Sequence, residues 1–219
     1  MKTHTYAIIF DLDGVLLDSE SDMTWMKNAL IDTLTFFNIQ PTVEHITLLD
    51  TKNLSRFPEI AHYFNIEVKE LWHIRNKFYT SHKVAAITNE HILPFPDVTA
   101  LELIHTRSEL AIISNSPQEV VDAFLKQFEL QHLFTTVVGR SGEYEDIFRL
   151  KPHPLLWHKL KPSLHASSII YVGDRASDKE FAKKTGMTFI GLNRYDHVFI
   201  DGYSSLHEIV EEIQKIIKN

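Results

Sequence analysis

The feature that most constrains the fold is a short apolar run near the N-terminus that ends in two aspartates and a glycine. Residues 7–10 have the uninterrupted apolar character of a strand buried in a parallel sheet, and Asp11, Asp13 and Gly14 follow at once. Ligands of open α/β sheets bind at the carboxyl ends of strands, and Gly14 lets the chain turn, so both carboxylates can meet at one site. We interpret Asp11 as a candidate nucleophile and Asp13 as a candidate general acid/base, although an Asp-Gly turn or a helix cap would use the same residues.

Segments of strand and helix character alternate in the second half of the chain. Strands are predicted over 109–113, 134–138, 168–172 and 188–192, and helices over 98–105, 118–128, 154–160, 177–185 and 206–217. This alternation predicts an α/β fold with a doubly wound, mostly parallel sheet.

Between the first strand and this region lies a segment whose pattern is helical throughout. Apolar residues recur at helical spacing from Met23 to about Asn38, and the pattern returns over 54–64 and 68–79 without a convincing strand. Two prolines at 94 and 96 then end the helical pattern. We expect an all-helical insert over 21–92, and an α/β core made of 1–20 and 93–219.

The composition excludes several classes of function. The chain of 219 residues has no cysteine, so it has neither disulfides nor thiolate sites, and its net charge of −7 argues against nucleic-acid or anionic membrane surfaces. Neither a signal-peptide core nor a run of about 18 apolar residues is present, so we expect a cytoplasmic protein without a membrane segment. The sequence leaves the oligomeric state open.

Two further strand ends carry residues that suit a phosphoryl group. Ser114 and Asn115 follow the strand at 109–113, where hydroxyl, amide and loop N–H groups can hold phosphate oxygens; a helix N-cap is the competing interpretation. Lys151 precedes a helix that begins with proline, and a lysine there can neutralise both an aspartate and a phosphoryl group; a solvated lysine is the alternative.

A second acidic strand end is formed by Asp174 and Asp178, four residues apart after the strand at 168–172. Carboxylates gathered from separate strands repel one another unless a cation joins them, and Mg²⁺ suits a site that keeps several waters and a substrate phosphate. Asp178 could instead cap the following helix.

Together these four motifs resemble the haloacid dehalogenase-like (HAD) hydrolase superfamily in order and approximate spacing. The stretches D-L-D-G-V-L-L-D-S, S-N-S, K-P-H-P and G-D-R-A-S-D correspond to its first to fourth motifs, and residues 7–19 and 93–192 carry the match. The resemblance implies a Rossmann-like core, and by position it implies that the helical insert is a C1 cap. Asp97 departs from the pattern, since a glycine is expected there.

The resemblance also implies residue roles. Asp11 would form an aspartyl-phosphate, and Asp13 would protonate the leaving oxygen and then activate water. Mg²⁺ would be held by Asp11, the Asp13 backbone carbonyl and Asp174, with Asp178 binding through water or pairing with Lys151. The residues that would bind the transferring phosphoryl group are Ser114, Asn115 and Lys151.

The resulting prediction is a magnesium-dependent phosphatase that acts on a small phosphorylated metabolite, such as a sugar phosphate or a phosphoglycolate-like acid. Dehalogenation is disfavoured because it needs neither Asp13 nor Mg²⁺. A sugar-phosphate mutase and a non-catalytic phospho-acceptor or binding module remain alternatives. Four cap cations are candidates for contact with the leaving group, although most are expected to be ordinary solvated helix residues: Lys52, Arg56, Arg75 and Lys77.

Overall fold

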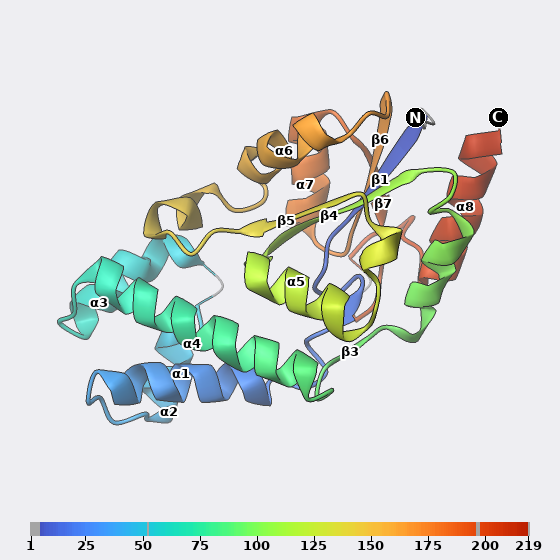
Figure 1. Ribbon diagram of the computed structural model, residues 1–219. Helices are drawn as coiled ribbons and strands as arrows, with labels where there is room; N and C mark the ends of the chain where they lie inside the picture. The colour runs from blue at the N-terminus through green and yellow to red at the C-terminus, as the bar shows by residue number, and fades with distance from the viewer. Residues whose placement is uncertain (1–4, 52, 196–197, 219) are drawn as a thin grey trace.

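A five-stranded parallel sheet forms the centre of the computed structural model, which describes residues 5–51, 53–195 and 198–218 (Figure 1). Its strands are β1 (Tyr6–Phe10), β4 (Glu109–Pro117), β5 (Thr136–Arg140), β6 (Ser168–Gly173) and β7 (Thr188–Gly191). Their order is β5-β4-β1-β6-β7, and every neighbouring pair is parallel. The chain winds outward from β1 in both directions, which opens a crevice at the carboxyl end of β1. The predicted doubly wound sheet is confirmed.

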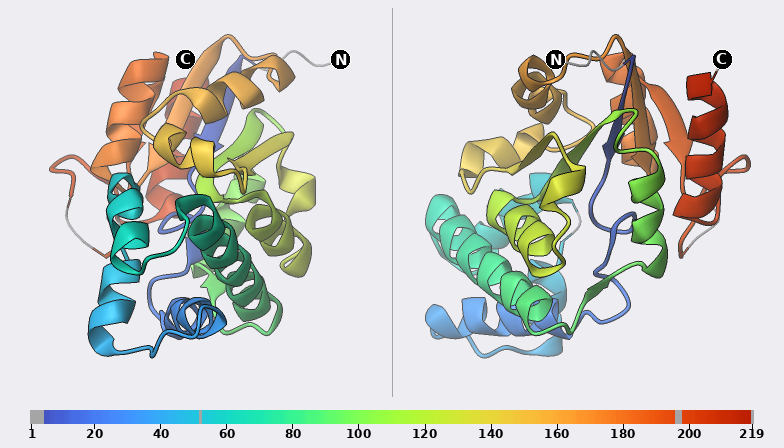
Figure 2. Two further views of the ribbon diagram at one scale, coloured as in Figure 1. Left: turned by 90° about the vertical axis from the view of Figure 1, so that its left-hand side faces the viewer. Right: turned by 45° about the vertical axis from the view of Figure 1, so that its right-hand side comes forward.

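Helices cover both faces of this sheet, as Figure 2 shows. Ile8 and Phe10 belong to one apolar cluster and Ile9 to the other, because side chains alternate across a strand. The first cluster includes residues of η2 (Pro96–Leu103), α5 (Gln118–Gln127) and α8 (Leu206–Lys218), and the second those of α6 (Leu155–Leu160) and α7 (Ala176–Thr185). Burial on both faces explains why the strand sequences are apolar without alternation.

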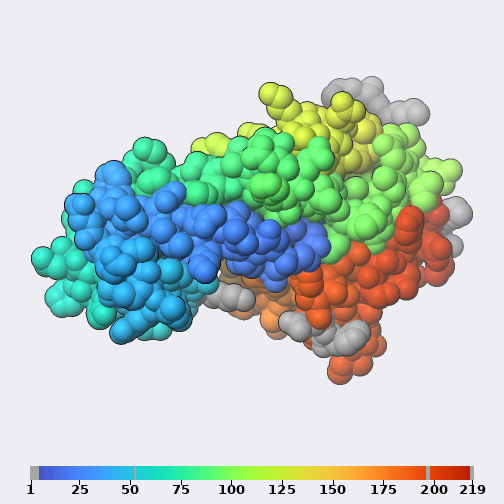
Figure 3. Space-filling model, turned by 90° about the horizontal axis from the view of Figure 1, so that it is seen from below, coloured from blue at the N-terminus to red at the C-terminus, as the bar shows by residue number. Residues whose placement is uncertain are grey.

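Residues 24–88 are helical and form a lobe at one end of the molecule (Figure 3). It contains α1 (Thr24–Phe36), α2 (Val43–Leu49), η1 (Leu54–Arg56), α3 (Phe57–Tyr63) and α4 (Val68–Thr88). Helix α1 packs along α4, and the rings of Phe57 and Trp72 meet edge to face at 5.4 Å. These two residues belong to the same apolar cluster as Ile8 and Phe10 of the sheet, so the lobe and this face of the sheet share one cluster.

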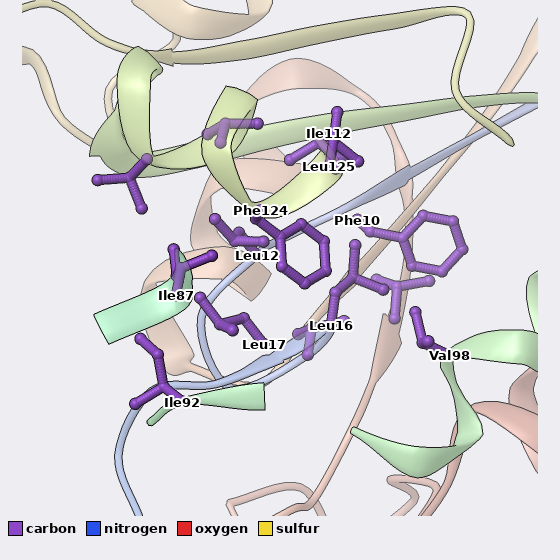
Figure 4. Close-up of a cluster of buried hydrophobic side chains, with 14 of the residues drawn as sticks. Phe10, Leu12, Leu16, Leu17, Ile87, Ile92, Val98, Ile112, Phe124 and Leu125 are labelled. Carbon is purple, nitrogen blue, oxygen red and sulfur yellow. The ribbon is translucent and has the colours of Figure 1, made fainter. Parts of the chain in front are cut away.

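Helix α4 continues nine residues beyond the predicted end at Tyr79. The additional turns carry Ile87 into the main apolar cluster, where it lies near Leu17 and Phe124 (Figure 4). The sequence pattern missed this end because α4 changes partners along its length, from the helical lobe to α5. One rigid helix therefore connects the lobe to the core.

Both connections between lobe and core run through a two-stranded antiparallel sheet that the sequence did not predict. Strand β2 (Leu17–Asp18) pairs with β3 (Leu93–Pro94). Two-residue strands are too short to show periodicity, and 93–97 reads as a turn because of its prolines. The predicted helix at 98–105 is the 3-10 helix η2, and three further 3-10 segments connect core elements: η3 (Gln131–Leu133), η4 (Tyr144–Arg149) and η5 (Lys161–Ser163).

Asp97, which stands where a glycine is expected, binds two distant parts of the chain through its carboxylate. Its carboxylate accepts hydrogen bonds from Arg194 Nη1 and Nη2 at 2.8 and 2.7 Å. The same carboxylate accepts the backbone N–H of Leu206, the first residue of α8, at 2.8 Å. Asp97 thus ties the start of the last helix to the return segment.

Across the residues that the structure describes, no helix is both long enough and apolar enough to cross a bilayer.

Candidate active site

Asp11 follows β1 directly, and its carboxylate lies in the crevice beyond the strand. Its backbone N–H donates to Val172 O at 3.0 Å, which continues the pairing with β6 by one residue. Oδ1 accepts the N–H of Leu12 at 2.7 Å, and Oδ2 lies 2.8 Å from Lys151 Nζ. The side chain is buried. The backbone and Lys151 together hold the Asp11 carboxylate in one orientation.

Asp13 lies in the same cavity and is held by three donors. Lys83 Nζ lies 2.5 Å from Oδ1, Ser19 Oγ donates to Oδ1 at 2.6 Å, and Ser116 Oγ donates to Oδ2 at 2.6 Å. Burial alone would raise the pKa of Asp13, but the charge of Lys83 and these hydrogen bonds lower it below its ordinary value.

The hydroxyl and amide residues at the end of β4 lie within the strand and do not form a helix cap. The strand runs four residues past the predicted end, with a shift in its pairing with β5 between Ile113 and Pro117. Ser114 Oγ accepts the N–H of Ser116 at 3.0 Å, and Asn115 Oδ1 accepts the backbone N–H of Lys151 at 2.9 Å. Helix α5 begins after Pro117 with no side-chain cap, so the N-cap interpretation is wrong.

Lys151 is buried between carboxylates, so the interpretation as a solvated lysine is also wrong. Its Nζ lies 2.8 Å from Asp11 Oδ2 and 2.8 Å from Asp178 Oδ1, and it donates to Tyr171 Oη at 2.7 Å. Burial lowers the pKa of Lys151. The charges of Asp11 and Asp178 raise this pKa by more than burial lowers it, so the net shift is upward. Lys151 therefore remains a fixed cation beside Asp11.

Asp174 and Asp178 approach Asp11 from the far side of the crevice. Asp178 is fully buried, and its Oδ2 accepts the N–H of Arg175 at 3.1 Å at the start of α7, so Asp178 also caps this helix. Gly14 has a φ of +76°, and a Cβ at this position would collide with the carboxylate of Asp174. Gly14 is thus required both by its backbone angle and by the approach of Asp174.

The three carboxylates form a group that suits a hard divalent cation. One oxygen each from Asp11, Asp174 and Asp178 lies within 4.8 Å of the others. Asp174 Oδ1 is buried and has no hydrogen-bond partner among the described residues. Burial and mutual repulsion raise the pKa of Asp11 to about 7 and that of Asp174 to about 8. Oxygen donors, excess negative charge and an unsatisfied carboxylate oxygen all fit Mg²⁺.

A cavity of about 400 Å³ extends from these aspartates to the helical lobe. Its core side includes Asp11, Asp13, Ser114, Asn115, Lys151 and Asp178, and its lobe side includes Trp25, Trp72, Arg75, Tyr79 and Lys83. The structure therefore brings the predicted site residues together around one cavity, with Asp174 reaching the same group of carboxylates.

The four cap cations differ in their surroundings. Lys52 lies outside the described residues. Arg56 pairs with Glu59 at 3.5 Å on the surface, Lys77 is exposed, and neither lines the cavity. Arg75 is buried and lines the cavity, so it is an exception to the expectation that most of these four residues are solvated.

Sequence reasoning missed two buried cations in this cavity, Lys83 on α4 and Arg140 at the end of β5. A signal for Lys83 was present, because Arg75, Tyr79 and Lys83 are spaced four residues apart and so share one face of a helix. The signal for Arg140 was weaker: it opens an unusually charged loop, 140–149, and Ser141 follows it, but no motif assigned this loop to a site.

An acidic cavity with a fixed lysine, at the carboxyl end of the central strand of a parallel sheet, is the setting of phosphoryl-transfer enzymes. The chain belongs to the haloacid dehalogenase-like hydrolase family, whose model matches residues 8–192. The predicted family is thus confirmed.

Curated relatives agree with this class. A phosphoglycolate phosphatase of Vibrio cholerae serotype O1 is 28% identical over 207 residues, covering 87% of this chain and 85% of the relative. A phosphoglycolate phosphatase of Mannheimia succiniciproducens is 26% identical over 212 residues, covering 88% and 87%. The prediction of a phosphoric monoester hydrolase is confirmed, at the level of a phosphatase or phosphomutase.

Solved structures share the fold over nearly the whole chain. A candidate phosphoglycolate phosphatase from Haemophilus somnus 129pt has a TM-score of 0.67 at 24% identity, covering 98% of this chain and 100% of its own. A candidate β-phosphoglucomutase from Thermotoga maritima has a TM-score of 0.63 at 19% identity, covering 96% and 99%. A HAD-superfamily hydrolase of subfamily IA from Geobacter sulfurreducens has a TM-score of 0.64 at 20% identity, covering 95% and 96%.

Proposed function

We propose that this protein is a magnesium-dependent phosphatase that hydrolyses a small phosphorylated metabolite through an aspartyl-phosphate on Asp11. The observation that carries the proposal is the pairing of two differently held carboxylates in one cavity. Asp11 lies against Lys151 and two further aspartates, whereas Asp13 is held apart by Lys83, Ser19 and Ser116. Two carboxylates in different environments suit two different chemical roles.

In the first step, Asp11 Oδ attacks phosphorus, an acyl-phosphate bond forms and the ester P–O bond breaks. Asp13 passes a proton to the leaving oxygen, so that the product departs as an alcohol. Because Lys83 lowers the pKa of Asp13, this proton enters with the monoanionic form of the phosphomonoester. In the second step, Asp13 takes a proton from water, which attacks the phosphoryl group and releases phosphate and free Asp11. Lys151 reduces the repulsion between the anionic nucleophile and the anionic phosphoryl group.

Ser114 and Asn115 would complete the phosphoryl site together with Lys151. Ser114 lines the cavity, and the side-chain amide of Asn115 binds the backbone of Lys151. Asn115 therefore contributes by fixing Lys151, and the charge of Lys151 acts on the phosphoryl oxygens.

Mg²⁺ would be held by Asp11, Asp174 and the backbone carbonyl of Asp13, with Asp178 acting through water or through Lys151. When bound, the ion supplies positive charge that offsets the repulsion among these carboxylates and the phosphoryl group. The buried, unpartnered Asp174 Oδ1 is the chain's own support for this assignment.

The helical segment would act as a cap over the site, with 21–92 as the cap and 1–20 with 93–219 as the core. Support comes from the cavity, which is lined from both parts. Trp72 Nε1 donates to Gly142 O at 2.8 Å and so joins cap to core near the cavity. Phosphoglycolate, the substrate in the names of the curated relatives, is one small phosphorylated acid that the enzyme would hydrolyse.

Phosphate release from a panel of phosphorylated metabolites tests the proposal, with Mg²⁺ and with EDTA. Release should require Mg²⁺ and should vanish in Asp11→Asn, while Asp122→Asn, an exposed carboxylate on α5, should retain it. Asp13→Asn should slow turnover and leave phosphate on acid-precipitated protein.

The outcomes separate this proposal from its alternatives. A mutase would transfer a phosphoryl group between hydroxyls of one sugar phosphate with little net release of phosphate. A non-catalytic binding module would show neither release nor transfer while still binding Mg²⁺.

A further inference from the structure

Two guanidinium groups lie buried in the cavity at its boundary with the helical lobe. Arg75 comes from α4 and Arg140 from the end of β5, and each has a relative exposure of 5%. Both residues line the cavity that also contains Asp11 and Asp13. The mechanism above uses neither of them.

Among the described residues, the guanidinium groups of these two arginines donate hydrogen bonds to backbone carbonyls. Arg75 Nε donates to Leu49 O at 3.3 Å, and Arg140 Nη1 donates to Ser141 O at 3.1 Å. Within the described part of the chain, no ion pair joins either guanidinium to a carboxylate. The charges of Asp50 and Glu119 favour the charged forms of Arg75 and Arg140 from longer range.

The two guanidiniums are close enough to repel each other. Burial lowers the pKa of Arg140 to about 10, and the charge of Arg75 contributes to this shift. Both side chains remain cationic near neutral pH, so two like charges share a buried position, and among the described residues no carboxylate lies within ion-pair distance of either. Such an arrangement is unfavourable unless an anion accompanies it.

Aromatic rings hold both guanidinium groups in place. The Arg75 Cζ atom lies 5.9 Å from the ring centre of Phe57 and 6.0 Å from those of Trp72 and Tyr79. Arg140 Cζ lies 5.1 Å from the ring centre of Trp72 and 5.7 Å from that of Tyr79. Because the shared Trp72 is itself bound to Gly142 O, the two arginines have little freedom to leave the cavity.

The guanidinium fork matches the planar carboxylate and the phosphate group, which it binds through paired hydrogen bonds. The aspartates at the other end of the cavity repel an oxyanion, whereas Arg75 and Arg140 attract it. A substrate whose phosphoryl group lies at Asp11 can therefore place a second negative group toward the two arginines, whereas Lys83 is already paired with Asp13 and Arg175 with Glu20.

We propose that Arg75 and Arg140 form a second anion site, and that the preferred substrate is a phosphomonoester whose leaving group carries a carboxylate or a second phosphate. This inference rests on the proposed phosphatase function, since it assigns the other end of the same substrate.

Matched esters test the inference. 2-Phosphoglycolate and 2-hydroxyethyl phosphate differ only in a carboxylate replaced by a hydroxymethyl group, and ethylene glycol bisphosphate tests a second phosphate in the same place. The wild-type kcat/KM should be higher for an anionic ester than for the neutral one. In Arg75→Met and in Arg140→Met, the ratio of kcat/KM for the anionic ester to kcat/KM for the neutral ester should fall by about 100-fold, because a buried charge partner is lost. A comparison of kcat/KM for ethylene glycol bisphosphate and for 2-phosphoglycolate shows which anion the site prefers.

Lys77→Met is the matched control, because Lys77 lies on the same helix but is exposed and outside the cavity lining. It should leave the ratio unchanged. Arg75→Lys, which keeps the charge but loses the fork, should retain part of the preference. Thermal unfolding with 3-phosphonopropanoate and 3-hydroxypropylphosphonate gives a binding readout without turnover: the carboxylate compound should raise the wild-type Tm more, and the difference should disappear in Arg75→Met.

The second anion site would be overturned if the wild-type kcat/KM were the same for the neutral ester and both anionic esters. It would also be overturned if the Arg→Met variants lowered kcat/KM for all three esters by the same factor. If the wild type releases phosphate from none of the esters, the proposed phosphatase function fails instead.

Discussion

At the scale of single residues, the charge state of each carboxylate depends on which cation reaches it. Lys83 holds Asp13 with a lowered pKa, whereas Lys151 is shared between Asp11 and Asp178 and leaves Asp174 without a direct lysine partner. Asp174 Oδ2 lies 3.7 Å from Nε of Arg175. The carboxylates of this site therefore repel one another, and a bound Mg²⁺ would relieve that repulsion.

Asp174→Asn should stabilise the metal-free protein and remove most of its response to Mg²⁺. The folded pKa of Asp174 is raised to about 8, so its ionisation weakens the fold progressively as the pH rises above the ordinary carboxyl value. In EDTA at about pH 9, where the penalty is complete, we expect the Tm of the variant to exceed that of the wild type by at least about 2–4 °C, which is the shift that about 1 kcal/mol produces in a chain of this size.

Differential scanning calorimetry with EDTA and with millimolar Mg²⁺ measures both effects. Asp122→Asn, at an exposed carboxylate, should show neither. A lower Tm for Asp174→Asn in EDTA, or an undiminished Mg²⁺ response, would contradict the assignment of Asp174 to the cation site.

At the scale of elements, the position of α8 depends on a contact that its own sequence does not contain. The apolar face of α8 packs on the first cluster through Leu206, Ile209, Val210 and Ile213. Its first N–H is bound by Asp97, 109 residues earlier in the chain, which is also paired with Arg194. An aspartate in place of the expected glycine therefore gives the helix a fixed start.

Asp97→Asn should destabilise the protein by about 2 kcal/mol at neutral pH, because two charged hydrogen bonds to Arg194 are weakened. Burial raises the pKa of Asp97, but the bonds from Arg194 and Leu206 outweigh it, and the net pKa is lowered. A lowered folded pKa gives stability that is present above the unfolded value and is lost as the pH falls through the folded value.

Urea unfolding at several pH values tests this expectation. The wild type should lose stability more steeply than Asp97→Asn between about pH 5 and about pH 3, so that the two curves converge in acid. Asp122→Asn should run parallel to the wild type. A constant difference between Asp97→Asn and the wild type at every pH would show that the carboxylate charge plays no part.

At the scale of the whole molecule, α4 links the helical lobe to the reaction site. Ile87 packs in the core cluster, while Lys83, one turn earlier, reaches Asp13 at 2.5 Å. The ammonium group also lies 5.1 Å from the ring centre of Trp25 on α1. The lobe thus controls the charge and orientation of a residue that belongs to the core.

Lys83→Met should lower kcat by about ten-fold or more, because Asp13 loses the cation that positions it for proton transfer. If Lys83 acts through Asp13, the same substitution should have little effect in an Asp13→Asn background, so that the two losses do not add. Steady-state kinetics of the four proteins in this double-mutant cycle gives the coupling.

Lys77→Met on the same helix should leave kcat unchanged in both backgrounds. Losses that multiply across the cycle would show instead that Lys83 acts on the substrate independently of Asp13.

The parallel sheet and its helices were predictable because their signals are local. Apolar runs such as 168–172 and the periodicity of 206–217 report burial within a few residues of sequence. The short pairing of β2 with β3 and the extension of β4 through Pro117 were not predictable, since both depend on partners distant in the chain.

By itself, the sequence determined the α/β class, the strand ends at which Asp11, Asp13 and Asp174 stand, the place of Lys151 before a helix, and the acidic character of the site. Only the tertiary structure decided which cation meets which carboxylate, and that Arg75 and Arg140 share one buried cavity with them. The physical reason is range: backbone propensity and apolar periodicity act between near neighbours, whereas ion pairs and desolvation depend on groups that only folding brings together.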